Sequence, residues 1–331
     1  MAEEQWNPGR LTKISGAYWE SFPLHVAVDL DVFTVIGEGS LSGEEIAARL
    51  SGNARAVRTL LDAVAAMGLL EKKAGHYSNT EAAKTFLIKT SPGYMGFAIK
   101  HHHHLVSAWS KLSQAVKTGK PVRKKRRTRS ELESFLMAMY NNASGLAPLI
   151  TREVDLSQRR HLLDLGGGPG TYAIHFCQAN PNLKATVFDL PTTAPFAQKT
   201  IKRFGMGSRI DFQPGDYLHD TVQGSYDVAW LSQILHSMGP ESCRVVIEKA
   251  VSVLEPGGLI LVHEFLLKDT HDGPLFPALF ALNMLVNTEE GRSYSEGEVK
   301  DMLLKTGVRD IRRLPFRGPT DSGIICGTFG D

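Results

Sequence analysis

The sequence predicts an α/β protein: a Rossmann-like, doubly wound sheet with a terminal antiparallel hairpin, preceded by a mostly α-helical winged-helix domain. Three observations support this fold class. Before about residue 155, apolar residues recur at helical spacing with almost no strand signal. After it, short apolar strands alternate with helices, which is the pattern of a mostly parallel sheet. A glycine-rich turn at residues 166–170 joins the first of these strands to a helix.

The N-terminal elements follow in order. Residues 10–36 predict one long helix or a helix pair, with Pro23 at a joint or kink. A Ser-x-x-Glu capping box at Ser42 then opens a short helix. Residues 54–67 have one apolar face, and two short strands flank Gly75. Helix, helix, helix and hairpin make a winged-helix pattern.

A winged helix in a gene regulator would place the helix at 54–67 in the major groove. Its basic residues are only Arg55 and Arg58, and Asp62 opposes them. We therefore favour a module that pairs subunits over one that binds DNA.

Two unusual runs follow. Residues 101–104 are four consecutive histidines, but in a helix only His101 and His104 share a face, so no metal site is expected. Residues 117–129 hold eight basic residues and no acid, which is typical of a solvated loop. An anion-binding or localisation role for this run stays open.

Composition limits the class of protein. The 331 residues suffice for two or three packed units, and a net charge of +2 argues against a nucleic-acid binder. No apolar run approaches the roughly 20 residues that span a bilayer, and the N-terminus lacks signal-peptide features. The three cysteines are far apart and indicate reduced thiols. We expect a cytoplasmic protein without a membrane partner.

The glycine turn predicts a nucleotide site. It follows a strand at 162–165, and a second strand at 185–188 ends in Asp189, an acid placed to hold ribose hydroxyls. A dinucleotide fingerprint, G-x-G-x-x-G, would need a glycine where Thr171 stands. The observed G-x-G-x-G spacing, preceded by Asp164, instead fits the first motif of S-adenosylmethionine-dependent methyltransferases.

The remaining strands complete the sheet. A third strand ends in Asp216 and Tyr217, an acid and a flat ring suited to adenine. The fourth and fifth strands lie in "YDVAWLSQIL" and "EPGGLILVHEF", a capped helix begins after Ser295, and a last hairpin turns near Gly318.

His236 stands just beyond the fourth strand, at the edge where such sheets bind ligands. Glu264, in the fifth strand, needs a partner if it is buried. A phenol has a pKa of about 10, so it is mostly protonated at neutral pH and needs a base to remove its proton. Histidine, whose usual pKa is about 6.5, is a suitable general base at that pH. We hypothesise that Glu264 orients His236, which removes a proton from a methyl acceptor. We interpret the neighbouring His263 as a packing residue.

Together, "LLDLGGGPG", "FDLP", "PGDY", "ILHSMGPESC", "LEPGG" and "VHEF" resemble the class I O-methyltransferases of the hydroxyindole and caffeate type. The resemblance covers nearly the whole chain. It implies S-adenosylmethionine as cofactor, a homodimer, and a hydroxylated aromatic or polyketide-like acceptor. The implied segments are a dimerisation domain at 1–90, a helical linker lining the acceptor pocket at 91–155, and an S-adenosylmethionine-binding domain at 156–331.

The resemblance also implies roles for single residues. His236 matches the catalytic histidine and Glu264 the carboxylate that orients it. The positions implied to bind the cofactor are Asp164, Gly166, Gly168, Asp189, Leu190, Asp216, Tyr217 and Ser232. The positions implied to bind the acceptor are Met137, Met139 and Glu290.

The chain departs from the family at three places. Ser237 replaces an acid after the histidine, Ser232 replaces a lysine found in many plant members, and Gly291 replaces a second glutamate, with Glu290 beside it. Ser237 and Gly291 leave one alternative open, a relative on the same scaffold that methylates nitrogen, carbon or sulfur or has abandoned net methyl transfer. A separate alternative is a winged-helix regulator that senses S-adenosylmethionine, against which the weakly basic helix at 54–67 speaks.

Overall fold

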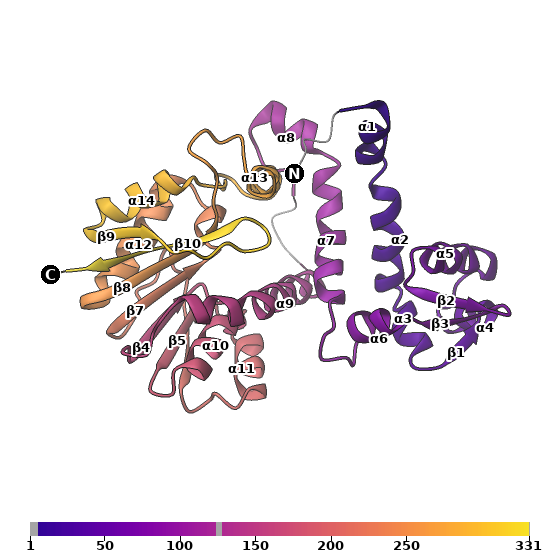
Figure 1. The fold of residues 1–331 in the computed structure, drawn as a ribbon, viewed down its shortest axis with the longest axis horizontal. Coiled ribbons are helices and arrows are strands. Elements are labelled where there is room, and N and C mark those ends of the chain that lie inside the picture. Colours follow the sequence, from indigo (N-terminus) through magenta and orange to yellow (C-terminus); the bar gives the residue numbers. More distant parts are fainter. Residues whose placement is uncertain (1–5, 124–127, 331) are drawn as a thin grey trace. The chain divides into compact units, whose positions relative to one another are not determined.

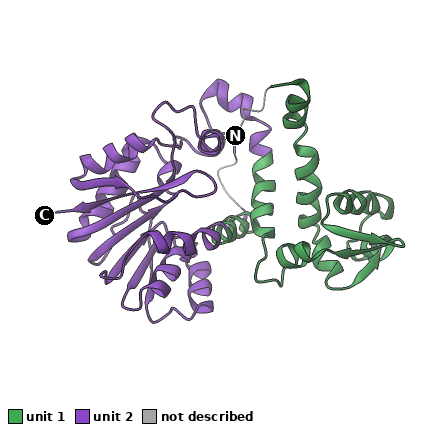
Figure 2. Cartoon of the chain, viewed as in Figure 1, with its two compact units in different colours: residues 1–106, 129–141 green, residues 107–128, 142–331 purple. Residues whose placement is uncertain are grey.

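The computed structural model describes residues 6–123 and 128–330, so residues 124–127 of the basic run lie outside the described residues. The chain divides into two compact units. The first contains the residues up to 106 together with 129–141, and the second contains 107–128 and the residues from 142 onwards (Figure 2). Helices α7 (Gly96–Trp109) and α9 (Arg129–Glu153) each begin in the first unit and end in the second.

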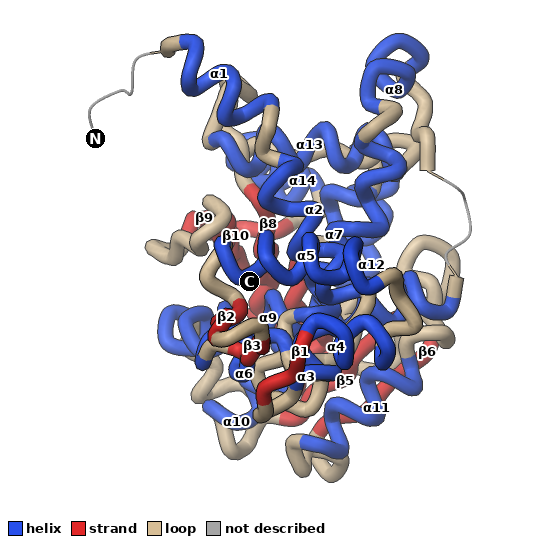
Figure 3. Tube along the Cα trace, turned by 90° about the vertical axis from the view of Figure 1, so that its right-hand side faces the viewer, coloured by secondary structure: helices blue, strands red, loops and turns tan. Residues whose placement is uncertain are grey.

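The first unit contains a three-stranded antiparallel sheet of order β1-β3-β2, and the rest of its described regular structure is helical (Figure 3). Besides α7 and α9, its elements are α1 (Pro8–Ser15), α2 (Tyr18–Asp29), α3 (Val32–Ile36), β1 (Ser40–Ser42), α4 (Gly43–Arg49), α5 (Ala54–Ala66), β2 (Leu70–Lys73), β3 (His76–Asn79) and α6 (Glu81–Leu87). The capping box at Ser42 and the hairpin around Gly75 are both present, as the sequence predicts.

The expected joint at Pro23 is wrong. Residues 10–36 form three helices, and Pro23 lies inside α2. The breaks fall instead at Gly16, which caps α1, and at Asp31, whose φ of 60° lies in the left-handed region. A proline removes one backbone hydrogen bond, but the helix continues because packing of its apolar face, including the buried Val28, supports it.

The second unit is a seven-stranded sheet of order β6-β5-β4-β7-β8-β10-β9 (Figure 1). Its strands are β4 (His161–Leu165), β5 (Lys184–Asp189), β6 (Ile210–Pro214), β7 (Tyr226–Ser232), β8 (Leu254–Phe265), β9 (Val308–Arg313) and β10 (Ser322–Phe329). Its helices are α8 (Leu112–Thr118), α10 (Thr171–Ala179), α11 (Ala194–Arg203), the 3₁₀ turn η1 (Leu235–Ser237), α12 (Pro240–Ser252), α13 (Leu275–Asn287) and α14 (Glu296–Lys305).

Strands β4 to β8 pair in parallel, and β10 runs antiparallel to both β8 and β9. The terminal hairpin and the capping box at Ser295 are therefore confirmed. Each face of the sheet has its own apolar core. Leu231 packs in the cluster that includes α12 and α14 residues, while Trp230 packs with α10 residues in the other. Burial on both faces explains why the strands are apolar without alternation.

The strand order reverses beside β4, with β5 on one side and β7 on the other. In a doubly wound sheet this switch point, at the carboxyl ends of the strands, is where ligands bind. No helix among the described residues combines the length and the apolarity needed to cross a bilayer.

Candidate active site

The glycine turn follows β4 and leads into α10. Gly166 and Gly168 have φ values of 70° and 56°, in the left-handed region that favours glycine. A Cβ on Gly168 would have no atom within 4 Å, so this backbone lies open to a ligand. A Cβ on Gly167 would lie 2.5 Å from Cγ of Asp164, so only glycine fits above that carboxyl group.

Asp164 is fully buried beneath the turn. Its Oδ2 accepts a hydrogen bond of 3.2 Å from the Ala173 N–H, while Oδ1 has no hydrogen-bond partner among the described residues. Burial raises the pKa of Asp164 to about 7, and the negative charge of Asp189 adds to the rise.

Asp189 ends β5 and holds the turn. Its Oδ2 accepts from the Gly168 N–H at 2.8 Å, and its Oδ1 accepts from the Leu190 N–H at 2.7 Å. Burial raises the pKa of Asp189, although hydrogen bonds from Gly168 and Thr193 oppose the rise. The Leu190 side chain is 46% exposed at the same edge.

Asp216 and Tyr217 follow β6. Asp216 is hydrogen bonded to His219, whose Nδ1 lies 3.0 Å from Oδ2, a contact that the sequence did not predict. Burial raises the pKa of Asp216, but His219 and the Leu218 N–H outweigh it and hold the pKa below its usual value. Tyr217 lies against the glycine turn, since a Cβ on Gly166 would be 3.4 Å from its ring.

His236 lies on η1 and meets Glu264 from β8. The His236 Nδ1 is 2.8 Å from the Glu264 Oε2, and the Glu264 side chain is 3% exposed. The other oxygen, Oε1, accepts from the backbone N–H groups of Leu235 at 2.9 Å and His236 at 3.4 Å. The two residues meet because β7 and β8 are parallel neighbours in which Ser232 pairs with His263.

Aromatic rings surround His236. The Phe280 ring, from α13, meets it edge-on with centroids 4.8 Å apart, and the Phe265 ring stacks on it at 6.0 Å. Phe276 extends this apolar wall, with its centroid 5.0 Å from that of Phe265.

The departures from the family pattern have local explanations. The Ser237 hydroxyl donates to the Ile234 carbonyl at 2.6 Å and so closes the turn. A Cβ on Gly291 would lie 2.6 Å from the His236 carbonyl oxygen, so a side chain there would clash with the turn. Glu290 is exposed and lies against Gly239.

The other implied site residues are placed as follows. Ser232 ends β7, and its hydroxyl lies 2.9 Å from the His263 Nδ1. Met137 and Met139 are half-buried on α9 in the first unit, whereas the remaining implied residues lie in the second. Among the described residues, no group of three or more His, Cys, Asp or Glu side chains could hold a metal ion.

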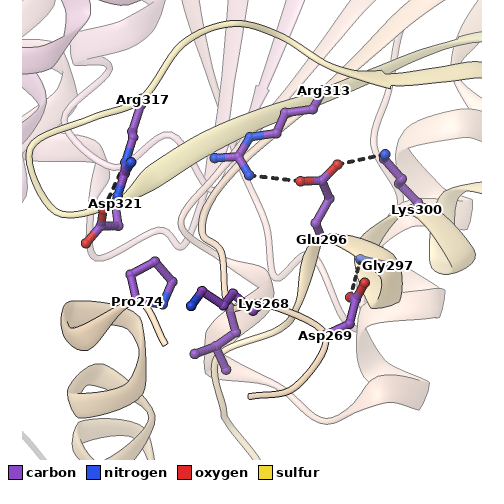
Figure 4. Close-up of a pocket in the computed structure, with 10 residues that line it drawn as sticks. Lys268, Asp269, Pro274, Glu296, Gly297, Lys300, Arg313, Arg317 and Asp321 are labelled. Carbon is purple, nitrogen blue, oxygen red and sulfur yellow. Dashed lines mark hydrogen bonds and ion pairs between the residues drawn. The ribbon is translucent and has the colours of Figure 1, made fainter. Parts of the chain in front are cut away.

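A pocket of about 680 Å³ lies elsewhere in the second unit, beside the start of α14 and the β9–β10 hairpin (Figure 4). Most of its charged side chains pair with one another: Glu296 contacts Lys300 and Arg313, and Arg317 contacts Asp321. It includes none of the residues implied by the sequence, and we assign it no function.

The sheet order, the glycine turn and the acids that end β5 and follow β6 define an S-adenosylmethionine-dependent methyltransferase. The chain belongs to the O-methyltransferase family. The model of the O-methyltransferase domain matches residues 109–309, and that of the O-methyltransferase dimerisation domain matches residues 12–89.

Similar proteins include two from Streptomyces. The chain is 32% identical to 3-hydroxy-5-methyl-1-naphthoate 3-O-methyltransferase of Streptomyces sahachiroi, over 97% of this chain and 95% of the relative. It is 31% identical to the tetracenomycin polyketide synthesis 8-O-methyl transferase TcmO of Streptomyces glaucescens, over 96% of each. The structure of human N-acetylserotonin methyltransferase in complex with S-adenosylmethionine superposes with a TM-score of 0.86 at 28% identity, covering 100% of both chains.

Proposed function

We propose that this enzyme methylates a hydroxyl group of an aromatic or polyketide-like small molecule, with His236 as the general base and Glu264 as the carboxylate that orients it. The supporting observation is the 2.8 Å hydrogen bond between the His236 Nδ1 and the buried Glu264. An ionised carboxylate can only accept, so Nδ1 keeps its proton and Nε2 is left to accept one.

Bound S-adenosylmethionine supplies an electrophilic methyl group on its sulfonium. The chain has to align the acceptor and exclude water. His236 removes the hydroxyl proton as the oxygen attacks, and Glu264 stabilises the positive charge that the imidazole gains. The aromatic wall of Phe265 and Phe280 beside His236 suits a flat apolar acceptor.

The proposed cofactor residues follow the order of the strands. We assign Asp216, Tyr217 and Leu190 to the adenine, Asp189 to the ribose, Gly166 and Gly168 to the methionine part, Asp164 to support of the turn, and Ser232 to the end nearest His236. Because β6, β5, β4 and β7 are neighbours in that order, a ligand along this edge would direct its methyl group towards His236. The open backbone at Gly168 fits such a ligand.

The proposal for the methyl acceptor names a class of compound rather than one molecule. The names of the two Streptomyces relatives describe 3-O-methylation of a hydroxynaphthoate and 8-O-methyl transfer in tetracenomycin polyketide synthesis, which supports a polycyclic aromatic acceptor for this enzyme. We propose Met137, Met139 and Glu290 as further contacts, with residues 91–155 lining the acceptor pocket and 156–331 binding the cofactor.

We also propose a homodimer formed through residues 1–90. Helices α1 and α2 expose large apolar side chains that a monomer would leave in water: Leu11, Ile14, Tyr18 and Trp19 are 59%, 58%, 56% and 74% exposed. Exposed apolar patches of this kind mark interaction sites, and the dimerisation-domain match covers most of this region.

The test is methyl transfer from labelled S-adenosylmethionine to a panel of phenols, naphthols, amines and thiols, with His236→Ala in parallel. We expect transfer to a hydroxyl and a loss of roughly 10²-fold or more in the variant. Transfer only to nitrogen or sulfur, or an undiminished rate in His236→Ala on a phenol, would contradict the proposal and favour the alternative acceptor chemistry. Thermal stabilisation of the enzyme by S-adenosylmethionine is a separate check on cofactor binding.

A further inference from the structure

A second histidine lies beside the proposed site and has no part in the mechanism above. His263 precedes Glu264 on β8, so its side chain points to the opposite face of the sheet. It is fully buried, and its ring stacks on Trp230 with centroids 5.7 Å apart. Burial lowers the pKa of His263 to about 4, so the ring is neutral at pH 7.

Both ring nitrogens of His263 are hydrogen bonded to serines. Nδ1 lies 2.9 Å from the Ser232 Oγ on β7, and Nε2 lies 3.0 Å from the Ser322 Oγ on β10. A neutral imidazole has one donor and one acceptor nitrogen, so the two serines must play opposite parts. Which nitrogen holds the proton decides which part each serine plays.

Burial decides between the two arrangements. Ser322 is fully buried, and in the described part of the chain its hydroxyl bonds only to His263. If Nε2 held the proton, the Ser322 hydroxyl proton would be buried without an acceptor, which is unfavourable. Ser322 therefore donates to Nε2, and the Nδ1–H of His263 donates to Ser232.

The same reasoning leaves the Ser232 proton free for a ligand. Tyr172 is the other polar neighbour of Ser232, and burial raises the pKa of Tyr172, so its phenol stays protonated and is able to donate to the Ser232 oxygen. With its oxygen accepting from the His263 Nδ1–H, Ser232 keeps its own proton to donate to a ligand. Ser232 ends β7, next to the strand that leads into Gly166, on the side assigned to the methionine part of the cofactor.

We propose that His263 is a positioning residue that makes Ser232 a hydrogen-bond donor to the carboxylate of the methionine moiety of S-adenosylmethionine. This inference rests on the proposed cofactor site. Two adjacent residues of β8 then have different roles. Glu264 positions the turn that contains His236, and His263 orients the Ser232 hydroxyl so that it donates to the methyl donor.

The test compares two ligands by calorimetry: S-adenosylhomocysteine, which has the carboxylate, and 5′-methylthioadenosine, which lacks it. Ser232→Ala should weaken S-adenosylhomocysteine binding roughly tenfold and leave 5′-methylthioadenosine binding unchanged. Ser322 is assigned no ligand contact. Ser322→Ala should nevertheless weaken S-adenosylhomocysteine binding about threefold and, like Ser232→Ala, leave 5′-methylthioadenosine binding unchanged. The double variant should bind no more weakly than Ser232→Ala alone, because both changes act through one hydrogen bond.

Thr200→Val is the matched control, since it removes another buried hydroxyl, one that donates to a backbone carbonyl within α11. A second pair addresses His263 itself. His263→Asn can keep an N–H near the Nδ1 position and should keep the preference for S-adenosylhomocysteine, whereas His263→Leu should lose it. The ratio of the two affinities corrects for any partly unfolded fraction.

Equal weakening of both ligands by Ser322→Ala, or additive losses in the double variant, would overturn the inference and leave His263 a packing residue. Failure of the unmodified enzyme to bind either ligand is a different result, because it would refute the proposed cofactor site as a whole.

Discussion

Replacing Glu264 by glutamine tests the proposed base most sharply, because the structure dictates how the amide must lie. The Glu264 Oε1 accepts two backbone N–H groups, from Leu235 and His236, in a buried setting. Only the carbonyl oxygen of glutamine can do this. The reverse orientation would leave both N–H groups facing an NH₂ group, at about 1–3 kcal/mol each.

In the Glu264→Gln variant, the amide nitrogen must therefore face the His236 Nδ1, where the carboxylate oxygen stood at 2.8 Å. Nδ1 then has to accept, so the ring proton moves to Nε2 and the nitrogen facing the acceptor can no longer take a proton. We expect kcat to fall roughly 10²- to 10⁴-fold, while the turn itself is retained.

The measurement is the initial rate of methyl transfer at saturating S-adenosylmethionine, with the affinity for S-adenosylmethionine and the thermal unfolding temperature recorded separately. Glu248→Gln is the matched control: Glu248 is exposed on α12 and forms an ion pair with Arg244 at 2.6 Å, away from the proposed site, so kcat should not change. The reasoning is refuted if Glu264→Gln keeps more than about a third of the kcat of the unmodified enzyme, since a wrong tautomer should lose far more than that.

Three further predictions concern the turn, pH and assembly. Gly167→Ala should destabilise the enzyme by about 1–3 kcal/mol and weaken S-adenosylmethionine binding, because the new Cβ would lie 2.5 Å from the Asp164 Cγ. Calorimetry measures both effects. Gly207→Ala is the control and should show neither, because a Cβ on Gly207 would have no atom within 4 Å. His263 has a folded-state pKa near 4, below its unfolded value of 6.5, so its contribution to stability is complete above pH 6.5 and falls by roughly 3 kcal/mol as the pH drops to 4. The free energies of unfolding of the unmodified enzyme and of His263→Gln, measured by denaturant titration, should converge as the pH falls from 6.5 to 4. Asp164 contributes a pH dependence of opposite sign, but that contribution is the same in both proteins. Parallel curves of unfolding free energy against pH would contradict the pKa assigned to His263. Trp19→Glu should turn a dimer into a monomer in analytical ultracentrifugation, because it places a charge on the exposed apolar face of α2, and an unchanged mass would argue against that face as the interface.

The sequence predicted the elements that short segments encode. Both capping boxes need only residues three positions apart, and the structure contains both. The glycine spacing located the turn, and Asp189 stands at the end of its strand as expected. The error at Pro23 also comes from reasoning over short segments. Such reasoning accounts for the backbone hydrogen bond that a proline removes, but it does not account for the tertiary packing that stabilises α2 across Pro23.

Contacts between distant residues needed the fold. The sequence suggested Glu264 as a partner for His236, but only the register of β7 and β8 shows that one oxygen also accepts from the backbone of the turn. The sequence likewise showed only that Gly291 stands where the family has a glutamate. Its position against the His236 carbonyl group became apparent only in the structure.

By itself, the sequence determined the class of fold and the position of the glycine turn, because helical period, strand alternation and glycine spacing depend on neighbours a few positions apart. It also suggested the proposed base. The tertiary structure alone decided which partners hold the His236 and His263 rings. The bonds that do this join residues 28 and 59 positions apart, His236 with Glu264 and His263 with Ser322, and such pairs form only once strand order and register are fixed.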